Sequence, residues 1–216
     1  MAKVLSNGLF KGRMGNLVYY VKDGIQYAKI YSPPNDPKTD NQLRHRAKIR
    51  AIGQYFKEFK QVIGIGYQSH GAPLKIFNEV LKYHLVNAIE ETQSTGKNKF
   101  KYRVIPEKVQ LAVGLINAPE ILNSKRNGQE IDLTWETALG KVPNRQTDSL
   151  AIVAFTEGLA VHVDYHAGIR QQGSSKVELP DKYTNPVHLW AFYWNGEKQA
   201  GASEDKVSNS VYLGVY

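Results

Sequence analysis

Alternating hydrophobic positions near the start of the chain predict a β-hairpin. Residues 17–21 (LVYYV) and 25–31 (IQYAKIY) are rich in β-branched and aromatic side chains. Asp23-Gly24 lies between them, and this dipeptide is favoured in two-residue hairpin turns because both positions need positive φ. On the second strand, one face carries Ile25, Tyr27, Lys29 and Tyr31, and the other carries Gln26, Ala28 and Ile30. Since neither face is polar throughout, we expect part of the ribbon to pack on another surface.

Three glycines, Gly8, Gly12 and Gly15, precede the hairpin. A P-loop places four residues between its glycines and follows them with Lys and Ser or Thr, and a dinucleotide-binding loop has Gly-x-Gly-x-x-Gly between a strand and a helix. Here Asn16 follows the glycines and a strand comes next, so both patterns fail in spacing and context. We predict tight bends in which glycine supplies positive φ. The prolines within residues 32–40 then end the ribbon.

The hydrophobic pattern becomes helical after residue 40. Thr39 or Asp40 is a suitable N-cap for a helix over residues 41–63. Its apolar sector is formed by Ile52, Phe56, Phe59 and Ile63. A second helix has Pro73 in its first turn and extends to Glu91. Its apolar face is formed by Phe77, Val80, Leu81, Leu85 and Ala88. Because the joining loop is short and contains glycine, the two helices should form an antiparallel helical hairpin.

From about residue 99 the hydrophobic pattern has a period of two. Eight short segments of this kind are separated by turn signals such as Asn127-Gly128 and Asn195-Gly196. With Trp135 early in the series, they predict an antiparallel β-sandwich of fibronectin or immunoglobulin type. Its core should be supplied by Trp135, Phe155 and Trp190 or Phe192. The predicted fold class is therefore α+β, with a basic β-hairpin and helical-hairpin region at 1–98 and a sandwich domain at 99–216.

Composition narrows the class of protein. A chain of 216 residues with 42% hydrophobic content is long enough to bury one or two cores. The chain has no cysteine, which excludes disulfides and thiolate metal sites. No segment approaches the roughly 18 apolar residues that span a bilayer, and the first residues do not form a signal peptide. We expect a cytoplasmic or virion location without a membrane span.

The positive charge is concentrated near the N-terminus. The formal net charge is +8, and residues 1–60 hold twelve of the basic residues against four acidic ones, which is the whole excess. The remaining residues contain equal numbers of basic and acidic side chains. If the protein has an anionic partner, that partner should meet the N-terminal third.

No residue pattern points to catalysis or to a metal. Residues 161–166 (VHVDYH) place His162, Asp164 and His166 at alternate positions of a strand, as metal ligands could be. Val161, Val163 and Tyr165 would then face a core, so we interpret the polar three as a solvated face without a fourth ligand. His84 is interpreted as a boundary histidine. Because a Gly-x-Ser-x-Gly elbow is also absent, we expect no enzyme activity, no metal and no cofactor.

The start of the first predicted helix is strongly basic. Arg44, Arg46, Lys48 and Arg50 would cover most sides of its first two turns. Such density can neutralise phosphates, and Tyr19, Tyr20, Tyr27 and Tyr31 of the hairpin could stack on bases. The competing interpretation is a solvated helix start whose basic side chains pair with acids of the second domain.

Three segments together resemble a family of unknown function found in Bacteroidota. They are GRMGNLVYYVKDGIQYAKIY, PKTDNQLRHRAKI and the C-terminal SNSVYLGVY. Members of that family pair a Gly-x-x-Gly-Asn hairpin and a Pro-x-Thr-x-x-Gln-x-x-x-Arg helix start with a β-rich C-terminal half. The resemblance spans nearly the whole chain. It implies the same architecture and adds no catalytic residue.

These observations lead to a functional hypothesis. We expect a non-enzymatic structural or assembly protein, for example a virion or mobile-element component. It would form a homo-oligomer or bind other structural proteins through the hairpin, with Tyr19, Tyr27 and Tyr31 as interface anchors. The alternative is a nucleic-acid-binding accessory protein that uses the basic N-terminal third. A carbohydrate- or protein-binding module on the sandwich would rest on fold analogy alone.

Overall fold

The chain folds into two compact units, Met1–Thr39 and Asp40–Tyr216. The structure, a computed structural model, describes residues 3–6, 8–93, 99–140, 145–183, 186–196 and 206–216. This division differs from the predicted regions 1–98 and 99–216. Strand β5 (Ile89–Thr92) pairs with β6 (Lys101–Val104) across that position, so the helices and the sandwich belong to one unit. Within the described residues, no helix is long and apolar enough to cross a membrane.

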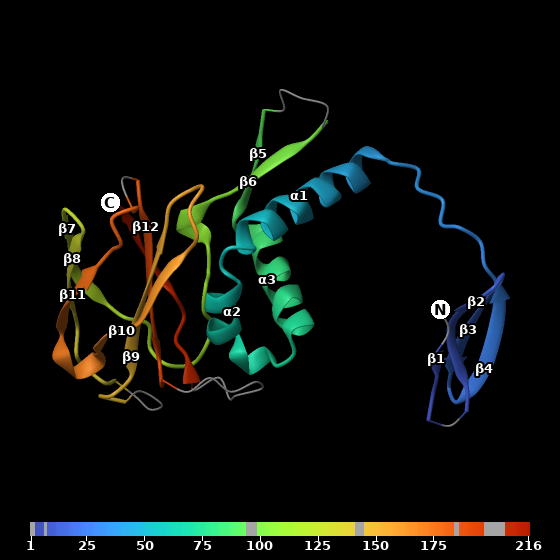
Figure 1. Cartoon of the computed structure of the whole chain (residues 1–216), viewed down its shortest axis with the longest axis horizontal. Coiled ribbons are helices and arrows are strands. Elements are labelled where there is room, and N and C mark those ends of the chain that lie inside the picture. The colour runs from blue at the N-terminus through green and yellow to red at the C-terminus, as the bar shows by residue number, and fades with distance from the viewer. Residues whose placement is uncertain (1–2, 7, 94–98, 141–144, 184–185, 197–205) are drawn as a thin grey trace. The chain divides into compact units, whose positions relative to one another are not determined.

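The N-terminal unit is a four-stranded antiparallel sheet (Figure 1). Its strands are β1 (Lys3–Val4), β2 (Phe10–Met14), β3 (Leu17–Lys22) and β4 (Ile25–Ile30), hydrogen-bonded in that order. The predicted β3–β4 hairpin is confirmed, and Asp23 and Gly24 both have positive φ, 52° and 79°. Gly15, with φ of 58°, turns β2 into β3. Strands β1 and β2 were not predicted, because they are short and glycine interrupts their hydrophobic pattern.

The described residues of the second unit form three α-helices, α1 (Asp40–Phe56), α2 (Lys60–Gly66) and α3 (Pro73–Asn87). The predicted helix over 41–63 is divided at residues 57–59, but its apolar sector is confirmed. Ile52, Phe56, Phe59 and Ile63 are all buried. On α3 the buried positions are Ile76, Val80 and His84, whereas Phe77 is 40% exposed. The second helix was predicted too long, because residues 89–92 form β5 instead.

The rest of the second unit is β-rich, as predicted, and the fold class α+β is confirmed. One sheet joins β7 (Ile121–Asn127), β8 (Glu130–Trp135) and β11 (Ser174–Glu178), with β8 in the centre. The other joins β9 (Ser149–Phe155), β10 (His162–Ile169), β12 (His188–Trp194) and β13 (Val211–Val215), in the order β10-β9-β12-β13. Short 3-10 turns η1 (Gln68–His70), η2 (Pro106–Lys108) and η3 (Arg170–Gln172) connect elements. Seven antiparallel strands in sheets of three and four agree with a fibronectin- or immunoglobulin-like sandwich.

A first hydrophobic core lies between these two sheets. Strand β8 contributes alternate residues that end at Trp135, which is 2% exposed. The facing positions of β9 and β12 are Leu150, Ile152, Ala154, Leu189, Ala191 and Tyr193. The Trp135 indole N–H donates to the Arg170 carbonyl over 3.0 Å, so its polar atom is satisfied inside the core.

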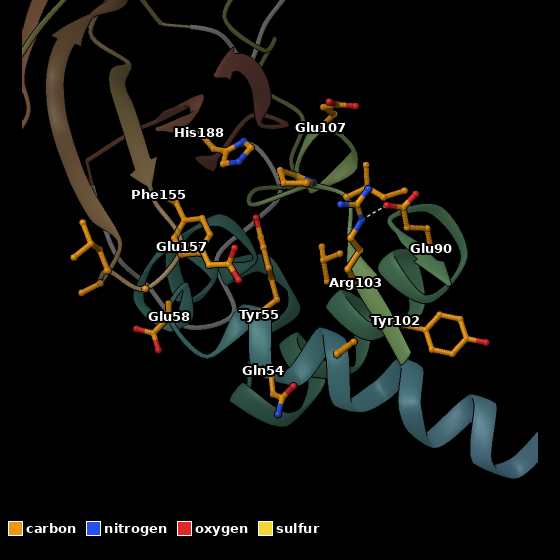
Figure 2. A pocket seen from close by; sticks show the side chains of 17 residues that line it. Gln54, Tyr55, Glu58, Glu90, Tyr102, Arg103, Glu107, Phe155, Glu157 and His188 are labelled. Atoms are coloured by element: carbon orange, nitrogen blue, oxygen red, sulfur yellow. Dashed lines mark hydrogen bonds and ion pairs between the residues drawn. The ribbon is translucent and has the colours of Figure 1, made fainter. Parts of the chain in front are cut away.

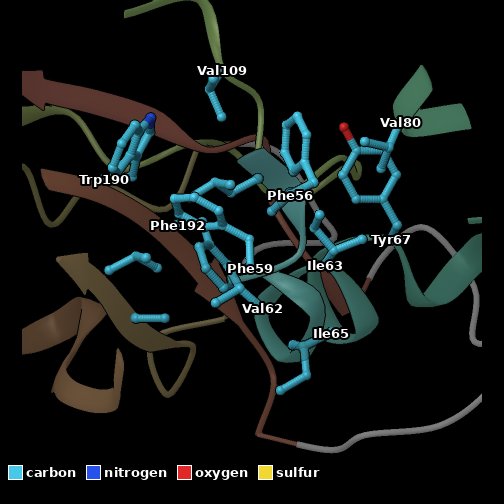
Figure 3. Close-up of a cluster of buried hydrophobic side chains, with 14 of the residues drawn as sticks. Phe56, Phe59, Val62, Ile63, Ile65, Tyr67, Val80, Val109, Trp190 and Phe192 are labelled. Atoms are coloured by element: carbon cyan, nitrogen blue, oxygen red, sulfur yellow. The ribbon is translucent and has the colours of Figure 1, made fainter. Parts of the chain in front are cut away.

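A second core lies on the other face of β9 and β12, against the helices (Figure 3). Phe59, fully buried, packs its ring 5.0 Å from Phe155 and 5.8 Å from Trp190, centroid to centroid. Phe192 lies in the same cluster. The prediction that Phe155 and either Trp190 or Phe192 fill the sandwich core is therefore wrong, although that of Trp135 is confirmed. Successive residues of a strand point to opposite faces, and here both faces are buried.

His84 is a buried polar residue of the helical layer, and its prediction as a boundary residue is wrong. The side chain is fully buried between α3 and the segment before the sandwich. Its Nδ1 lies 2.7 Å from the Val80 carbonyl, and the Gln110 backbone N–H donates to Nε2 over 3.0 Å. Because one ring nitrogen donates and the other accepts, the imidazole is neutral. Burial lowers the pKa of His84 to about 4.

Replacing Trp135 by Ala should lower the free energy of unfolding of the second unit by about 3–5 kcal/mol, because a large core side chain is removed and a cavity remains. Urea titration followed by tryptophan fluorescence measures this. A loss below about 1 kcal/mol would show that Trp135 is not in the core.

Acid should destabilise the second unit through His84. Its pKa falls from about 6.5 in the unfolded chain to about 4 in the folded one. The stabilisation is therefore complete above pH 6.5 and disappears as the pH falls toward 4, by an amount on the order of 3 kcal/mol. The free energy of unfolding should be measured for the wild type and for His84→Gln at pH 7, 5.5 and 4.5. The difference between the two proteins should become smaller as the pH falls. Because burial also lowers the pKa of His162 and His188, the difference between the two proteins isolates His84; a constant difference would contradict this account.

Candidate functional site

Alternation along the N-terminal sheet separates its side chains into two unlike faces. The pairs Arg13 with Val18, Tyr20 with Tyr27 and Lys3 with Lys11 show which residues share a face. The basic face carries Lys3, Lys11, Arg13, Val18, Tyr20, Lys22, Ile25, Tyr27, Lys29 and Tyr31. The apolar face carries Val4, Phe10, Met14, Leu17, Tyr19, Val21, Ala28 and Ile30, with Gln26.

On the basic face, aromatic rings and cations lie together. The Arg13 guanidinium carbon is 3.7 Å from the centre of the Tyr31 ring. The rings of Tyr20 and Tyr27 stack with centroids 5.5 Å apart and planes 17° apart, and both side chains are about two-fifths exposed. The four strands, all described, contain no acidic residue, since Asp23 lies in the turn. The positive charge of this face is therefore not neutralised by its own strands.

The apolar face of the sheet is exposed to solvent. Ile30 is 78% exposed and Val4 66%, and Phe10, Met14 and Leu17 are also exposed. The Phe10 and Tyr19 rings pack with their centroids 6.0 Å apart. No side chain on this face is charged, so it can meet a dry surface without burying a charge.

The structure does not bring the three predicted anchor tyrosines onto one surface. Tyr19 lies on the apolar face, whereas Tyr27 and Tyr31 lie on the basic face. The sequence interpretation missed Lys3, Lys11 and Arg13 as neighbours of these tyrosines. The sequence did contain one signal, because Lys11 and Arg13 are two positions apart and would share a face of a strand. The pairing of β2 with β3 places that face beside the tyrosines.

The predicted basic residues of α1 are partly engaged within the second unit. Arg44 forms an ion pair of 2.7 Å with Glu91 and lies over the Phe100 ring, 4.2 Å from its centre. The Lys48 ammonium lies 5.4 Å from the centre of the Tyr102 ring. Arg46 and Arg50 are exposed on the same helix. The competing interpretation expected the basic side chains of the helix start to pair with acids of the predicted domain at 99–216, whereas the partner of Arg44 is Glu91, within the predicted region at 1–98.

A pocket of about 880 Å³ opens in the second unit beside α1 and β6 (Figure 2). Its wall carries Glu58, Glu90, Glu107 and Glu157, together with Tyr55, Tyr102, Arg103, Phe155 and His188. Arg103 is paired with Glu90. The Tyr55 hydroxyl is buried without a hydrogen-bond partner, and burial raises the pKa of this phenol. The excess of carboxylates makes the pocket suited to a cationic group rather than to an anion.

The chain matches a family model over residues 9–214, and the family is described as a family of unknown function (DUF6266). The chain belongs to this family. The match extends over parts of both units and includes β2, β3 and β4 of the N-terminal sheet, whereas β1 lies before its first residue. No curated protein matches the chain.

The histidine motif of β10 is divided by a bulge. The pairing of β10 with β9 shifts between Asp164 and Gly168, and the Asp164 carboxylate accepts the backbone N–H of His166 over 2.9 Å. His162 lies against the Tyr183 ring. Among the described residues, no three His, Cys, Asp or Glu side chains are grouped as metal ligands. The sequence analysis predicted that His162, Asp164 and His166 form a solvated strand face and do not bind a metal. A direct measurement of metal binding tests this prediction.

Addition of zinc or of a chelator should leave the Tm unchanged within about 1 °C, because a ligand raises stability only when it binds the folded state. Differential scanning fluorimetry with one to ten equivalents of zinc measures this. A saturating rise in Tm that His162→Asn abolishes would establish a metal site.

Proposed function

We propose that this protein is a non-enzymatic assembly subunit that self-associates through the apolar face of its N-terminal sheet. The observation that carries this proposal is the lack of any core in that unit. Every described residue of Met1–Thr39 is at least partly exposed, including the large hydrophobic side chains of the apolar face. Such a sheet needs a covering surface to be stable.

The energy balance explains why. Ordering each residue costs about 1–2 kcal/mol of backbone entropy, and burial recovers only about 25 cal/mol per Å² of apolar surface. Domains below about 40 residues seldom bury enough surface alone and use oligomerisation, metals or disulfides instead. This chain has no cysteine. Covering the apolar face is the remaining source of stability for the sheet.

A second copy is the covering surface that the charge distribution favours. The unit holds six basic and two acidic residues, and its strand cations all lie on the basic face. Two copies can therefore pack apolar face to apolar face, as two sheets about 10 Å apart, while their basic faces point away from each other. Such a contact uses the same surface on both partners and is closed by a two-fold axis.

The proposal extends to a larger structure that would contain many copies of this protein. A subunit held together by such contacts could belong to a virion or another mobile-element structure, together with other structural proteins. Support for a structural role comes from the exposed apolar face and from the lack of a recognised catalytic motif in the sequence. Isolation of the native particle and identification of its components would test this wider part.

Replacing Leu17 and Tyr19 together by Thr should dissociate the oligomer. Each large apolar side chain contributes about 1.5–3 kcal/mol when fully buried, so the dissociation constant should rise by about 100-fold or more. Sedimentation velocity across a range of protein concentrations measures the change. The matched control replaces Val18 and Tyr20 by Thr, the adjacent positions on the basic face.

The control should associate like the wild type, because its changes lie on the other side of the same strand. Equal effects of the two double variants would show that the substitutions act through sheet stability. A wild-type protein that stays monomeric at all concentrations, with protected β1–β4 amides in hydrogen exchange, would refute self-association, because the sheet would then be stable without a second copy.

A further inference from the structure

We propose that the basic face of the N-terminal sheet binds single-stranded nucleic acid, with its tyrosines stacking on bases and its cations contacting phosphates. The cations are Lys3, Lys11, Arg13, Lys22 and Lys29, and the tyrosines are Tyr20, Tyr27 and Tyr31. This face lies opposite the proposed assembly surface, so the inference stands whether or not the protein self-associates.

Charge is the first argument. The side chains of one face project from neighbouring strands about 4.8 Å apart, so five cations share one small surface. The strands contribute no carboxylate to compete for them. A polyanion that crosses the strands would release counterions at several points, which is the main source of affinity for nucleic acids.

The aromatic side chains distinguish nucleic acid from other polyanions. Tyr20 and Tyr27 present stacked, exposed rings between the lysines at both ends of their strands, and the Arg13 guanidinium covers the Tyr31 ring. A positively charged surface with exposed rings is the arrangement by which sheet proteins hold unpaired bases. A free phosphate or an anionic membrane would use the cations and leave the rings without a role.

The shape of the surface favours a single strand over a duplex. Bases of a duplex are stacked on each other, so they cannot lie on tyrosine rings unless they are unpaired. Readout of duplex DNA usually needs a helix or ribbon that enters the major groove. The basic face is instead the broad side of a four-stranded sheet, with Tyr20 on the central strand β3 and Tyr27 beside it on the edge strand β4.

The structure also separates this site from the basic helix α1. Arg44 is engaged with Glu91 and Phe100, and Lys48 lies on Tyr102. The helix belongs to the second unit, whereas the basic face belongs wholly to the first. Variants in the two places therefore provide matched changes of charge with different expected results.

The test is fluorescence anisotropy of the full chain with a labelled 12-nucleotide oligo-dT and oligo-U, at 50 to 200 mM salt. Lys11→Gln/Arg13→Gln/Lys29→Gln should weaken binding at least about tenfold. The slope of log K against log salt should fall by about two, since each phosphate contact on a single strand contributes about 0.7. The matched control, Arg44→Gln/Arg46→Gln/Arg50→Gln, removes the same charge from α1 and should keep both affinity and slope.

A second variant tests the stacking. Tyr20→Ile/Tyr27→Ile keeps an apolar, strand-favouring pair at these paired positions but removes the rings. Affinity should fall about tenfold or more for the pair, with the salt slope unchanged, because stacking does not release counterions. Loss of slope together with affinity would show that this variant acts through unfolding of the sheet.

Four results would overturn the proposal. They are no binding at 50 mM salt, equal affinity for a duplex of the same sequence, loss of binding in the α1 variant alone, or binding that is unchanged in the tyrosine variant. Equal binding to vesicles with phosphatidylserine, independent of the tyrosines, would indicate a general anion surface. Leu17→Thr/Tyr19→Thr keeps the basic face intact, so loss of its association without loss of oligonucleotide binding separates failure of one proposal from failure of the other.

Discussion

Double-sided burial of β9 and β12 is the constraint on which the second unit depends. Every residue of β9 is buried, and β12 is buried at all positions after His188. One face of each strand packs on the three-stranded sheet and the other packs on the helices around Phe59. Because these strands are shared by both cores, the helices cannot be separated from the sandwich without exposing Phe155, Trp190 and Phe192.

The N-terminal unit is built in the opposite way. Its four strands are joined by backbone hydrogen bonds, but no side chain is buried among its described residues. Its register separates an uncharged apolar face from a face of cations and tyrosines. A sheet of this kind is more stable when another surface covers it, which is why both proposals for this protein are placed there.

Much of the local structure follows from the sequence because it depends on near neighbours. Asp23-Gly24 specifies the hairpin turn, since both residues tolerate positive φ. The spacing of Ile52, Phe56, Phe59 and Ile63 specifies the buried side of the helical segment. Phe77 was predicted to be buried on α3, but Ile76 is buried instead. Both residues lie near the apolar side of the helix, and the elements packed against it decide which one is covered. The sequence interpretation selected Tyr19, Tyr27 and Tyr31 as one surface, but strand pairing places Tyr19 on the opposite face from the other two. It assigned the basic cluster to α1 and not to the sheet.

The sequence by itself determined the α+β class, the hairpin, the strand-rich C-terminal half and the basic N-terminal third, because period, turn residues and charge are local properties. Only the tertiary structure decided the rest. A strand buried on both faces has no polar side, so its sequence does not show which face points to which core. Only the packing of the elements shows that Trp135 and Trp190 belong to different cores. The two faces of the N-terminal sheet likewise depend on the pairing of β2 with β3. Shifting that register by one residue would exchange the positions of Arg13 and Met14, and so would place the charge on the other side.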